Sequence, residues 1–91
     1  MDSIWVADLR VSRATADKIA GRHGLSERDI RDHVVAVAGL RFEWNDHPER
    51  GRRVLVETFI RDQRVLVVLY PRVRDAYGDS WSLGSAYPID P

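Results

Sequence analysis

The distribution of apolar and polar residues in the first third of the chain predicts one short strand followed by two helices. The strand is the apolar segment 4–9. Ser12 can cap a first helix over residues 13–22, because a serine oxygen accepts a hydrogen bond from a free N–H group of the first turn. Gly24 suits the left-handed position that ends a helix, so the first helix is expected to stop there.

The second helix is expected to begin after Ser26, with Asp29 three residues later in the arrangement of a capping box. Three apolar residues recur at intervals of four and three, so one face of this helix is predicted to be buried until Gly39 ends it. They are Ile30, Val34 and Val37. The other face carries acids as well as arginines, which disfavours a helix that reads DNA.

From Leu40 onward apolar and polar residues alternate, which is the pattern of half-buried strands. We expect strands over residues 40–45, 53–61, 64–72 and 81–87, with polar loops at 45–51 and 74–80. The predicted element order is βααββββ. At 91 residues the chain is expected to form a single α+β domain, residues 1–91, with two helices packed on one face of a twisted antiparallel sheet.

The two longest predicted strands form a hairpin around a two-residue connection, Asp62 and Gln63. If Arg61 pairs with Arg64, alternate residues of both strands form one apolar face that packs on the helices. That face pairs Ile60 with Val65, Thr58 with Val67 and Val56 with Leu69. The opposite face pairs Arg53 with Arg72 and carries between them Leu55, Glu57, Phe59 and Tyr70.

The last predicted strand has small residues on one face and larger ones on the other. The small set is Ser82, Gly84 and Ala86, and the opposite set is Trp81, Leu83, Ser85 and Tyr87. A row of small residues on one face of a strand permits close approach either of a ligand or of a neighbouring strand. The sequence leaves both interpretations open.

The composition narrows the class of protein. Lysine and arginine number 14, aspartate and glutamate also number 14, and there is no cysteine. The lack of cysteine excludes disulfides and thiolate metal sites. No apolar run approaches the roughly 18 residues that span a bilayer. The N-terminus has no signal-peptide pattern, so we expect a cytoplasmic protein without membrane contact.

The charge is unevenly distributed although the net charge is zero. Residues 50–74 contain seven arginines against two acids, which leaves five net positive charges in this segment. Such a stretch is typical of a surface that binds anions. Arginine forks suit phosphate and aromatic rings suit bases, so an anionic ligand on this face is one interpretation. The competing interpretation is a solvated face on which Glu49 and Glu57 neutralise the arginines.

The three histidines do not form a metal site. None of them has the spacing of paired metal ligands, so we predict neither a metal nor another cofactor. His23 falls at the C-terminal end of the first helix, where the helix dipole favours the protonated ring. It is a candidate general acid or phosphate contact, or simply a C-terminal cap.

Four segments within residues 18–88 resemble BrnT-type toxins of the RelE-like superfamily and, more closely, a related uncharacterised branch. They are Arg22-His23-Gly24-Leu25-Ser26, Gly51-Arg52-Arg53, Gln63-Arg64-Val65-Leu66-Val67-Val68-Leu69-Tyr70 and Leu83-Gly84-Ser85-Ala86-Tyr87. The resemblance implies a RelE-like fold and a toxin of a bacterial type II toxin–antitoxin system. Such a toxin cleaves RNA without a metal and is blocked by a cognate antitoxin.

The resemblance also implies which residues act on RNA. His23, Arg53 and Arg64 match motif positions, whereas Tyr87 stands where BrnT-type chains carry arginine. Attack of a ribose 2′-OH on the adjacent phosphate needs a base, an acid and cations around the phosphate. The predicted catalytic residues are His23, Arg53, Glu57, Arg64 and Tyr87, and the predicted RNA-binding residues are Arg61, Tyr70 and Arg72.

A second hypothesis belongs to another class of function. The chain is then a non-catalytic module that binds a protein or RNA partner through the open face of the sheet.

A chain of this size buries only about 60–65% of the surface that its unfolded form exposes. A homodimer is therefore a further prediction.

Overall fold

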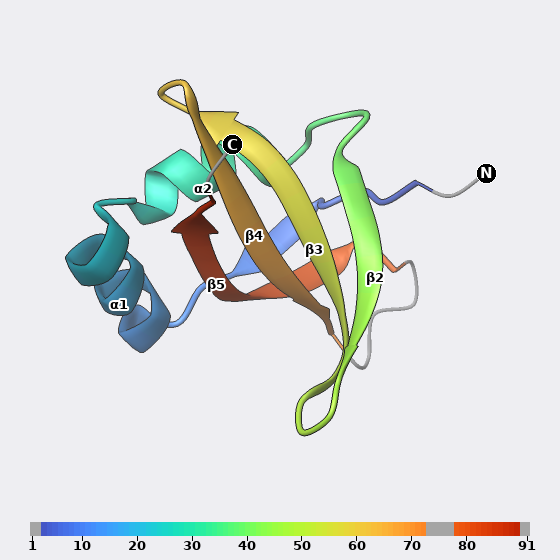
Figure 1. Ribbon diagram of the computed structural model, residues 1–91. Helices are drawn as coiled ribbons and strands as arrows, with labels where there is room; N and C mark the ends of the chain where they lie inside the picture. Colours follow the sequence, from blue (N-terminus) through green and yellow to red (C-terminus); the bar gives the residue numbers. More distant parts are fainter. Residues whose placement is uncertain (1–2, 73–77, 90–91) are drawn as a thin grey trace.

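The computed structural model describes residues 3–72 and 78–89, which form two helices and a five-stranded sheet (Figure 1). The α+β class is confirmed, and the elements follow the predicted order. They are β1 Asp8–Arg10, α1 Arg13–His23, α2 Glu27–Val34, β2 Arg41–His47, β3 Gly51–Ile60, β4 Gln63–Pro71 and β5 Ser80–Pro88.

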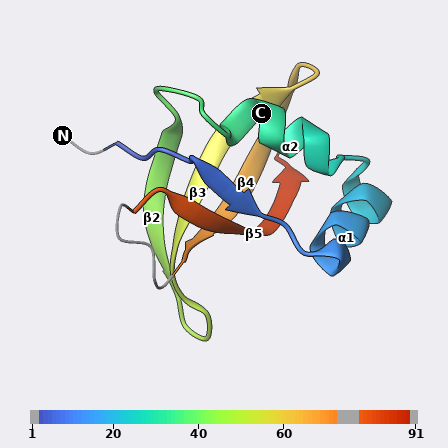
Figure 2. The same cartoon turned by 180° about the vertical axis from the view of Figure 1, so that it is seen from behind.

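The sheet has the strand order β1-β5-β4-β3-β2 and is mixed. Strands β2 to β5 form the predicted antiparallel meander. The expectation of a wholly antiparallel sheet is wrong at one edge, because β1 pairs with β5 in parallel and Asp8 lies opposite Ser80 (Figure 2). The connection from β1 to β5 contains both helices and strands β2 to β4, so it has the length that a parallel pair needs. As a result, β1 covers the edge of β5 that the meander leaves unpaired.

The helix starts are as the sequence predicts. The Ser12 hydroxyl accepts a hydrogen bond from the Thr15 N–H at 3.1 Å, and Gly24 ends α1 with φ of 66°. In α2 the Ser26 hydroxyl accepts from the Asp29 N–H, while the Asp29 carboxylate accepts from the Ser26 N–H, each at 3.0 Å. These local hydrogen bonds explain why both starts could be read from single residues.

Helix α2 ends at Val34, five residues before the predicted stop at Gly39. Val35 is extended, Ala36 has φ of 57°, and the Ala36 N–H donates to the Val6 carbonyl oxygen at 2.8 Å. A run rich in β-branched valine has little helical preference to oppose this tertiary hydrogen bond. Only the first part of the predicted apolar stripe is therefore helical and buried, namely Ile30 and Val34.

The hairpin between β3 and β4 turns at Arg61 and Asp62, one residue earlier than predicted. Both have left-handed φ angles, 51° and 67°, and such turns match the twist of the flanking strands. Phe59 therefore pairs with Arg64, and every predicted cross-strand pair is wrong by two residues. A shift of two keeps each side chain on its face. The predicted apolar face is confirmed by the buried residues Val54, Val56, Ile60, Val65, Val67 and Leu69.

Strand β5 contains an irregularity that the alternation of its sequence does not reveal. Leu83 pairs with Leu69, but the next pair is Ser85 with Val68, so Gly84 is an extra residue. Such a bulge reverses the faces that follow it. The predicted grouping of faces is thus wrong beyond Leu83, and the residues of β5 that are buried are Trp81, Leu83 and Ala86.

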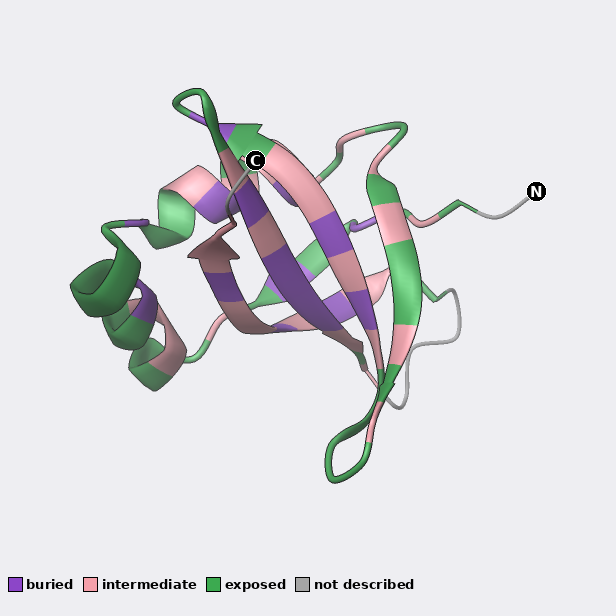
Figure 3. Cartoon of the chain, viewed as in Figure 1, coloured by how far each residue is buried: buried purple, intermediate pink, exposed green. Residues whose placement is uncertain are grey.

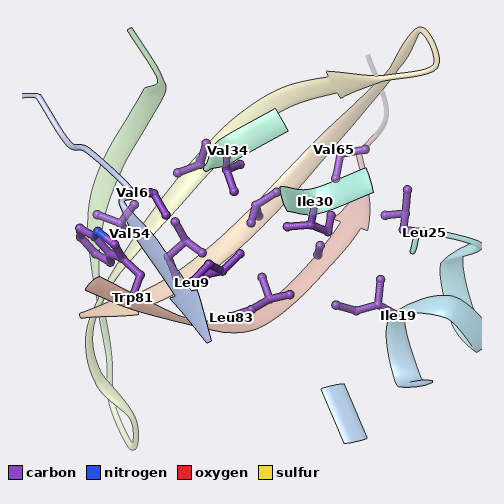
Figure 4. Packing of buried hydrophobic residues seen from close by; sticks show 14 of the residues in the cluster. Val6, Leu9, Ile19, Leu25, Ile30, Val34, Val54, Val65, Trp81 and Leu83 are labelled. Atoms are coloured by element: carbon purple, nitrogen blue, oxygen red, sulfur yellow. The ribbon is translucent and has the colours of Figure 1, made fainter. Parts of the chain in front are cut away.

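The core lies between the inner face of the sheet and the two helices (Figures 3 and 4). Helix α2 packs across β3, and α1 lies beside β5. Helix α1 contributes Ile19 as its buried residue, and Leu25 closes the space between the helices. Because α2 packs on this inner face and α1 lies at the β5 edge, the outer face of the meander is left open.

Candidate functional site

The open face is the side of strands β2 to β5 that points away from the helices, toward the viewer in Figure 1. Alternation along each strand assigns its residues. They are Arg41, Glu43 and Asn45 of β2; Arg53, Leu55, Glu57 and Phe59 of β3; Arg64, Leu66, Val68 and Tyr70 of β4; and Ser82, Ser85 and Tyr87 of β5. Three arginines and two glutamates therefore share one surface.

Arg64 and Glu57 form an ion pair on the open face. The Arg64 Nε and Nη2 atoms both lie 2.8 Å from the Glu57 Oε1 atom, and both side chains are partly buried. The pair is diagonal between β3 and β4, since Glu57 is directly opposite Leu66. Glu57 makes no hydrogen bond through its other oxygen within the part of the chain that the structure describes. The other carboxylate oxygen of Glu57 is therefore left without a partner among the described residues, beside a guanidinium.

Arg53 is held by neutral groups instead of a carboxylate. Its Nε donates to the Asn45 Oδ1 atom at 2.8 Å, and its Nη1 donates to the Tyr70 hydroxyl at 3.5 Å. Among the described residues Arg53 makes no ion pair. The guanidinium is thus oriented by its neighbours while its positive charge stays uncompensated, which is the electrostatic condition for binding an anion.

His23 and Tyr87 come together from opposite ends of the sequence. Their ring centroids are 6.3 Å apart with the planes at 46°. Tyr87 pairs with Leu66, which in turn pairs with Glu57. At about 4.8 Å per strand, the backbones at Tyr87 and Glu57 are therefore roughly 10 Å apart across one row of the sheet. The packing of α1 beside β5 is what adds a histidine to this row.

One predicted RNA-binding arginine, Arg61, lies away from the open face. Arg61 is in the hairpin turn, where its Nη1 lies 3.0 Å from the Asp29 Oδ1 and its Nη2 donates to the Gly24 carbonyl oxygen at 3.4 Å. These contacts direct it to the helices. Arg72 follows the end of β4, and its N–H donates to the Ser80 carbonyl oxygen. The predicted Arg53–Arg72 pair is wrong because the register is shifted by two residues.

The contact of Arg61 with Asp29 has an electrostatic consequence. The pKa of the Asp29 carboxyl is lowered from its ordinary value of 3.8. The main cause is the hydrogen bond from the Ser26 backbone N–H, and the hydrogen bond from Arg61 adds to it. Arg61 therefore stabilises the start of α2 and is not directed at a ligand on the open face.

Tyr70 occupies the space that Gly84 leaves. A Cβ atom on Gly84 would lie 2.3 Å from the Tyr70 Cε2 atom, so no side chain fits there while the ring stays in place. Close approach by a neighbouring strand is thus the interpretation confirmed at Gly84. The contact also places the Tyr70 hydroxyl next to Arg53. The Tyr70 hydroxyl therefore helps to orient Arg53, while RNA binding by Tyr70 stays a prediction.

A shallow hollow of about 270 Å³ lies on the open face between β2, β3 and β4. Sequence analysis did not identify it, because it depends on the register of three strands. Leu55 and Leu66 form an apolar part of its lining, and the charged residues are from β2 and β3. The lining residues are Arg41, Phe42, Glu43, Leu55, Glu57 and Leu66.

The inner face near β2 has an aromatic cluster that the sequence also did not indicate. The Trp44 and Trp81 ring centroids are 6.0 Å apart, and the Arg52 guanidinium carbon lies 4.1 Å from the Trp44 ring centroid. The Trp81 Nε1 donates to the Trp5 carbonyl oxygen at 3.1 Å. This cluster is on the side away from Arg53 and Glu57, so it is not part of the open-face site.

Within residues 3–72 and 78–89, no group of three histidine, aspartate or glutamate side chains is placed to hold a metal ion. In the same part of the chain, neither helix is long and apolar enough to cross a membrane. Metal independence of the proposed reaction stays a prediction.

Comparison with protein-family models, with curated protein sequences and with solved structures found no significant match to this chain. The relation to BrnT-type toxins therefore rests on the sequence motifs alone and is a proposal.

Proposed function

We propose that this chain has a RelE-like fold and is a metal-independent RNA endonuclease of the BrnT-like toxin type, acting through the open face of its sheet. One observation supports this most strongly. Residues singled out for catalysis from the sequence come from α1, β3, β4 and β5 and lie on the open face or at its edge, and they are His23, Arg53, Glu57, Arg64 and Tyr87. A cytoplasmic location and an antitoxin that covers this face belong to the same proposal.

In the proposed reaction Glu57 takes the proton of the ribose 2′-OH through the carboxylate oxygen that Arg64 does not bind. The 2′-oxygen then forms a bond to the adjacent phosphorus, the bond from phosphorus to the 5′-oxygen breaks, and the products are a 2′,3′-cyclic phosphate and a 5′-hydroxyl. Arg64, fixed by Glu57, stabilises the negative charge that develops on the phosphate. His23 donates a proton to the leaving 5′-oxygen, and Tyr87 orients its ring.

Arg53 has a different role in this proposal. It is four residues from Glu57 along β3, which is about 14 Å of extended chain. At that distance it contacts a neighbouring phosphate and not the one that reacts. RNA would therefore run along β3, with Arg53 contributing to binding and Glu57 to chemistry.

The test is cleavage of an unstructured RNA in the presence of EDTA. We expect wild type to release cyclic phosphate ends, and Glu57→Gln and His23→Ala to lower the rate by about 10²-fold or more, because each removes a proton carrier. Glu49→Gln, an exposed acid in the loop before β3, is the matched control and should cleave like wild type. Equal cleavage by all four proteins would show that a contaminating nuclease cleaves the RNA, and the proposed enzymatic activity would then be wrong.

A second candidate is the non-catalytic interaction module. The observation that favours it is Phe59, which is 58% exposed on the open face and lies opposite Arg64. An exposed aromatic ring beside a paired arginine suits a protein partner as well as a nucleobase. Dependence of binding on salt separates these two partners, because phosphate contacts weaken steeply with added salt and apolar contacts do not. A homodimer also stays a prediction.

A further inference from the structure

We propose that the hollow between β2, β3 and β4 binds a guanine base of single-stranded RNA, with Glu43 and Arg41 as the residues that select it. The inference rests on the proposed binding of RNA to the open face and names the base that this face prefers. It does not depend on whether the chain cleaves RNA.

The size and floor of the hollow suit a flat heterocycle. Its volume of about 270 Å³ is below the roughly 300–1,000 Å³ of pockets that enclose larger ligands. Leu55 and Leu66 are half-buried neighbours on adjacent strands and present apolar surface between charged residues. A base can lay one face on these leucines while its polar edge points to the rim.

The rim on β2 carries two unpaired charges of opposite sign. Arg41 and Glu43 are both exposed and are two residues apart on the same face, about 7 Å along the strand. Within the described residues neither makes an ion pair or a side-chain hydrogen bond. Glu57, which lies directly opposite Arg41, is instead bound by Arg64. The Arg41 guanidinium can donate two parallel hydrogen bonds and the Glu43 carboxylate can accept two, and these groups lie on neighbouring positions of one face.

Guanine is the base whose edge matches this pair. Its N1–H and N2–H groups are adjacent donors that fit the two oxygens of the Glu43 carboxylate. Its O6 and N7 atoms are adjacent acceptors that fit the Arg41 guanidinium. Adenine has an amino group where guanine has O6, so it would place a donor against Arg41. Cytosine and uracil lack the N7 acceptor and the paired donors.

The test measures binding of uridine pentamers whose central base is guanine, adenine, cytosine or uracil. A 2′-O-methyl backbone prevents cleavage, and fluorescence anisotropy of an end-labelled pentamer at low salt gives the affinity. We expect the guanine pentamer to bind about tenfold or more tightly than the others. Inosine, which lacks the N2 amino group, should bind between guanine and uracil.

Matched variants locate the preference. Glu43→Gln should abolish the preference for guanine, so that the guanine and all-uridine pentamers bind this variant with equal affinity. Glu49→Gln makes the same change of charge outside the hollow and should keep the preference. Equal affinity for all four pentamers would overturn the guanine site and leave RNA binding intact. If the Glu43→Gln variant still preferred guanine, Glu43 would not be the residue that selects the base. If no pentamer bound, the proposed function would be overturned as well.

Discussion

Arg53 differs from Arg64 and Arg61 in the groups that orient its guanidinium. Arg64 and Arg61 are paired with carboxylates, whereas Arg53 is held by the Asn45 side chain and the Tyr70 hydroxyl. A neutral acceptor fixes the direction of a guanidinium without cancelling its charge. Asn45 is therefore a positioning residue for Arg53. The sequence pattern places Asn45 where a strand meets a loop and does not indicate this role.

We expect Asn45→Ala to weaken RNA binding by roughly three- to tenfold, equivalent to about 0.7–1.4 kcal/mol, because Arg53 loses its fixed orientation. In an Arg53→Ala background the same substitution should have no further effect, since coupled residues are not additive. The measurement is RNA affinity by fluorescence anisotropy at constant salt. Gln63→Ala, at the far end of the hairpin, is the control. Additive losses in the double variant would contradict a positioning role.

At the scale of elements, the start of α2 and the β3–β4 turn stabilise each other. Asp29 accepts hydrogen bonds from the Ser26 N–H at the helix start and from Arg61 in the turn, and its pKa is lowered. A carboxyl with a lowered pKa in the folded state stabilises the fold most above its unfolded pKa. This contribution is lost as the pH falls through the folded value.

Asp29→Ala should therefore lower the melting temperature near neutral pH. The difference from wild type should shrink as the pH falls below about 3.8, because the wild-type carboxyl then becomes protonated and loses its ionic contacts. Thermal melts across this pH range provide the measurement. Asp32→Ala is the control, since Asp32 is exposed on the same helix and makes only a 3.8 Å contact with Arg28. A difference that stays constant with pH would contradict the electrostatic explanation.

At the scale of the whole molecule, the charge of the open face decides between an RNA and a protein partner. Its arginines are Arg41, Arg53 and Arg64, while the excess of acids lies outside residues 50–74. Each phosphate contact with a single strand contributes about −0.7 to the slope of log affinity against log salt. Arg41 is assigned to the guanine base, so the two phosphate contacts of Arg53 and Arg64 predict a slope of about −1.4.

The salt slope can be measured with labelled RNA in sodium chloride. Arg53→Ala should reduce the magnitude of the slope by about 0.7 because one phosphate contact is lost. Arg50→Ala removes an exposed arginine of the β2–β3 loop and should leave the slope nearly unchanged. A flat response of wild type would contradict binding through phosphates and favour an apolar protein interface through Phe59.

Local sequence determined the helix starts, the β-meander and the face on which most strand residues lie. The hydroxyls of Ser12 and Ser26 act within three residues, so a single sequence is enough to place them. Alternate residues of a strand point to opposite faces of the sheet, so a register error of two residues leaves each side chain on its predicted face. For this reason Arg53, Glu57 and Arg64 were assigned to one surface even though their pairing was wrong.

Only the tertiary structure decided which of these residues meet. The register followed from the left-handed turn at Arg61, the bulge at Gly84 reversed the faces of β5, and the end of α2 followed from a hydrogen bond to Val6. Each depends on groups that are distant in sequence or on a backbone conformation that residue type indicates weakly. Strand partners and side-chain contacts are long-range choices, whereas propensity and periodicity describe only the nearest neighbours.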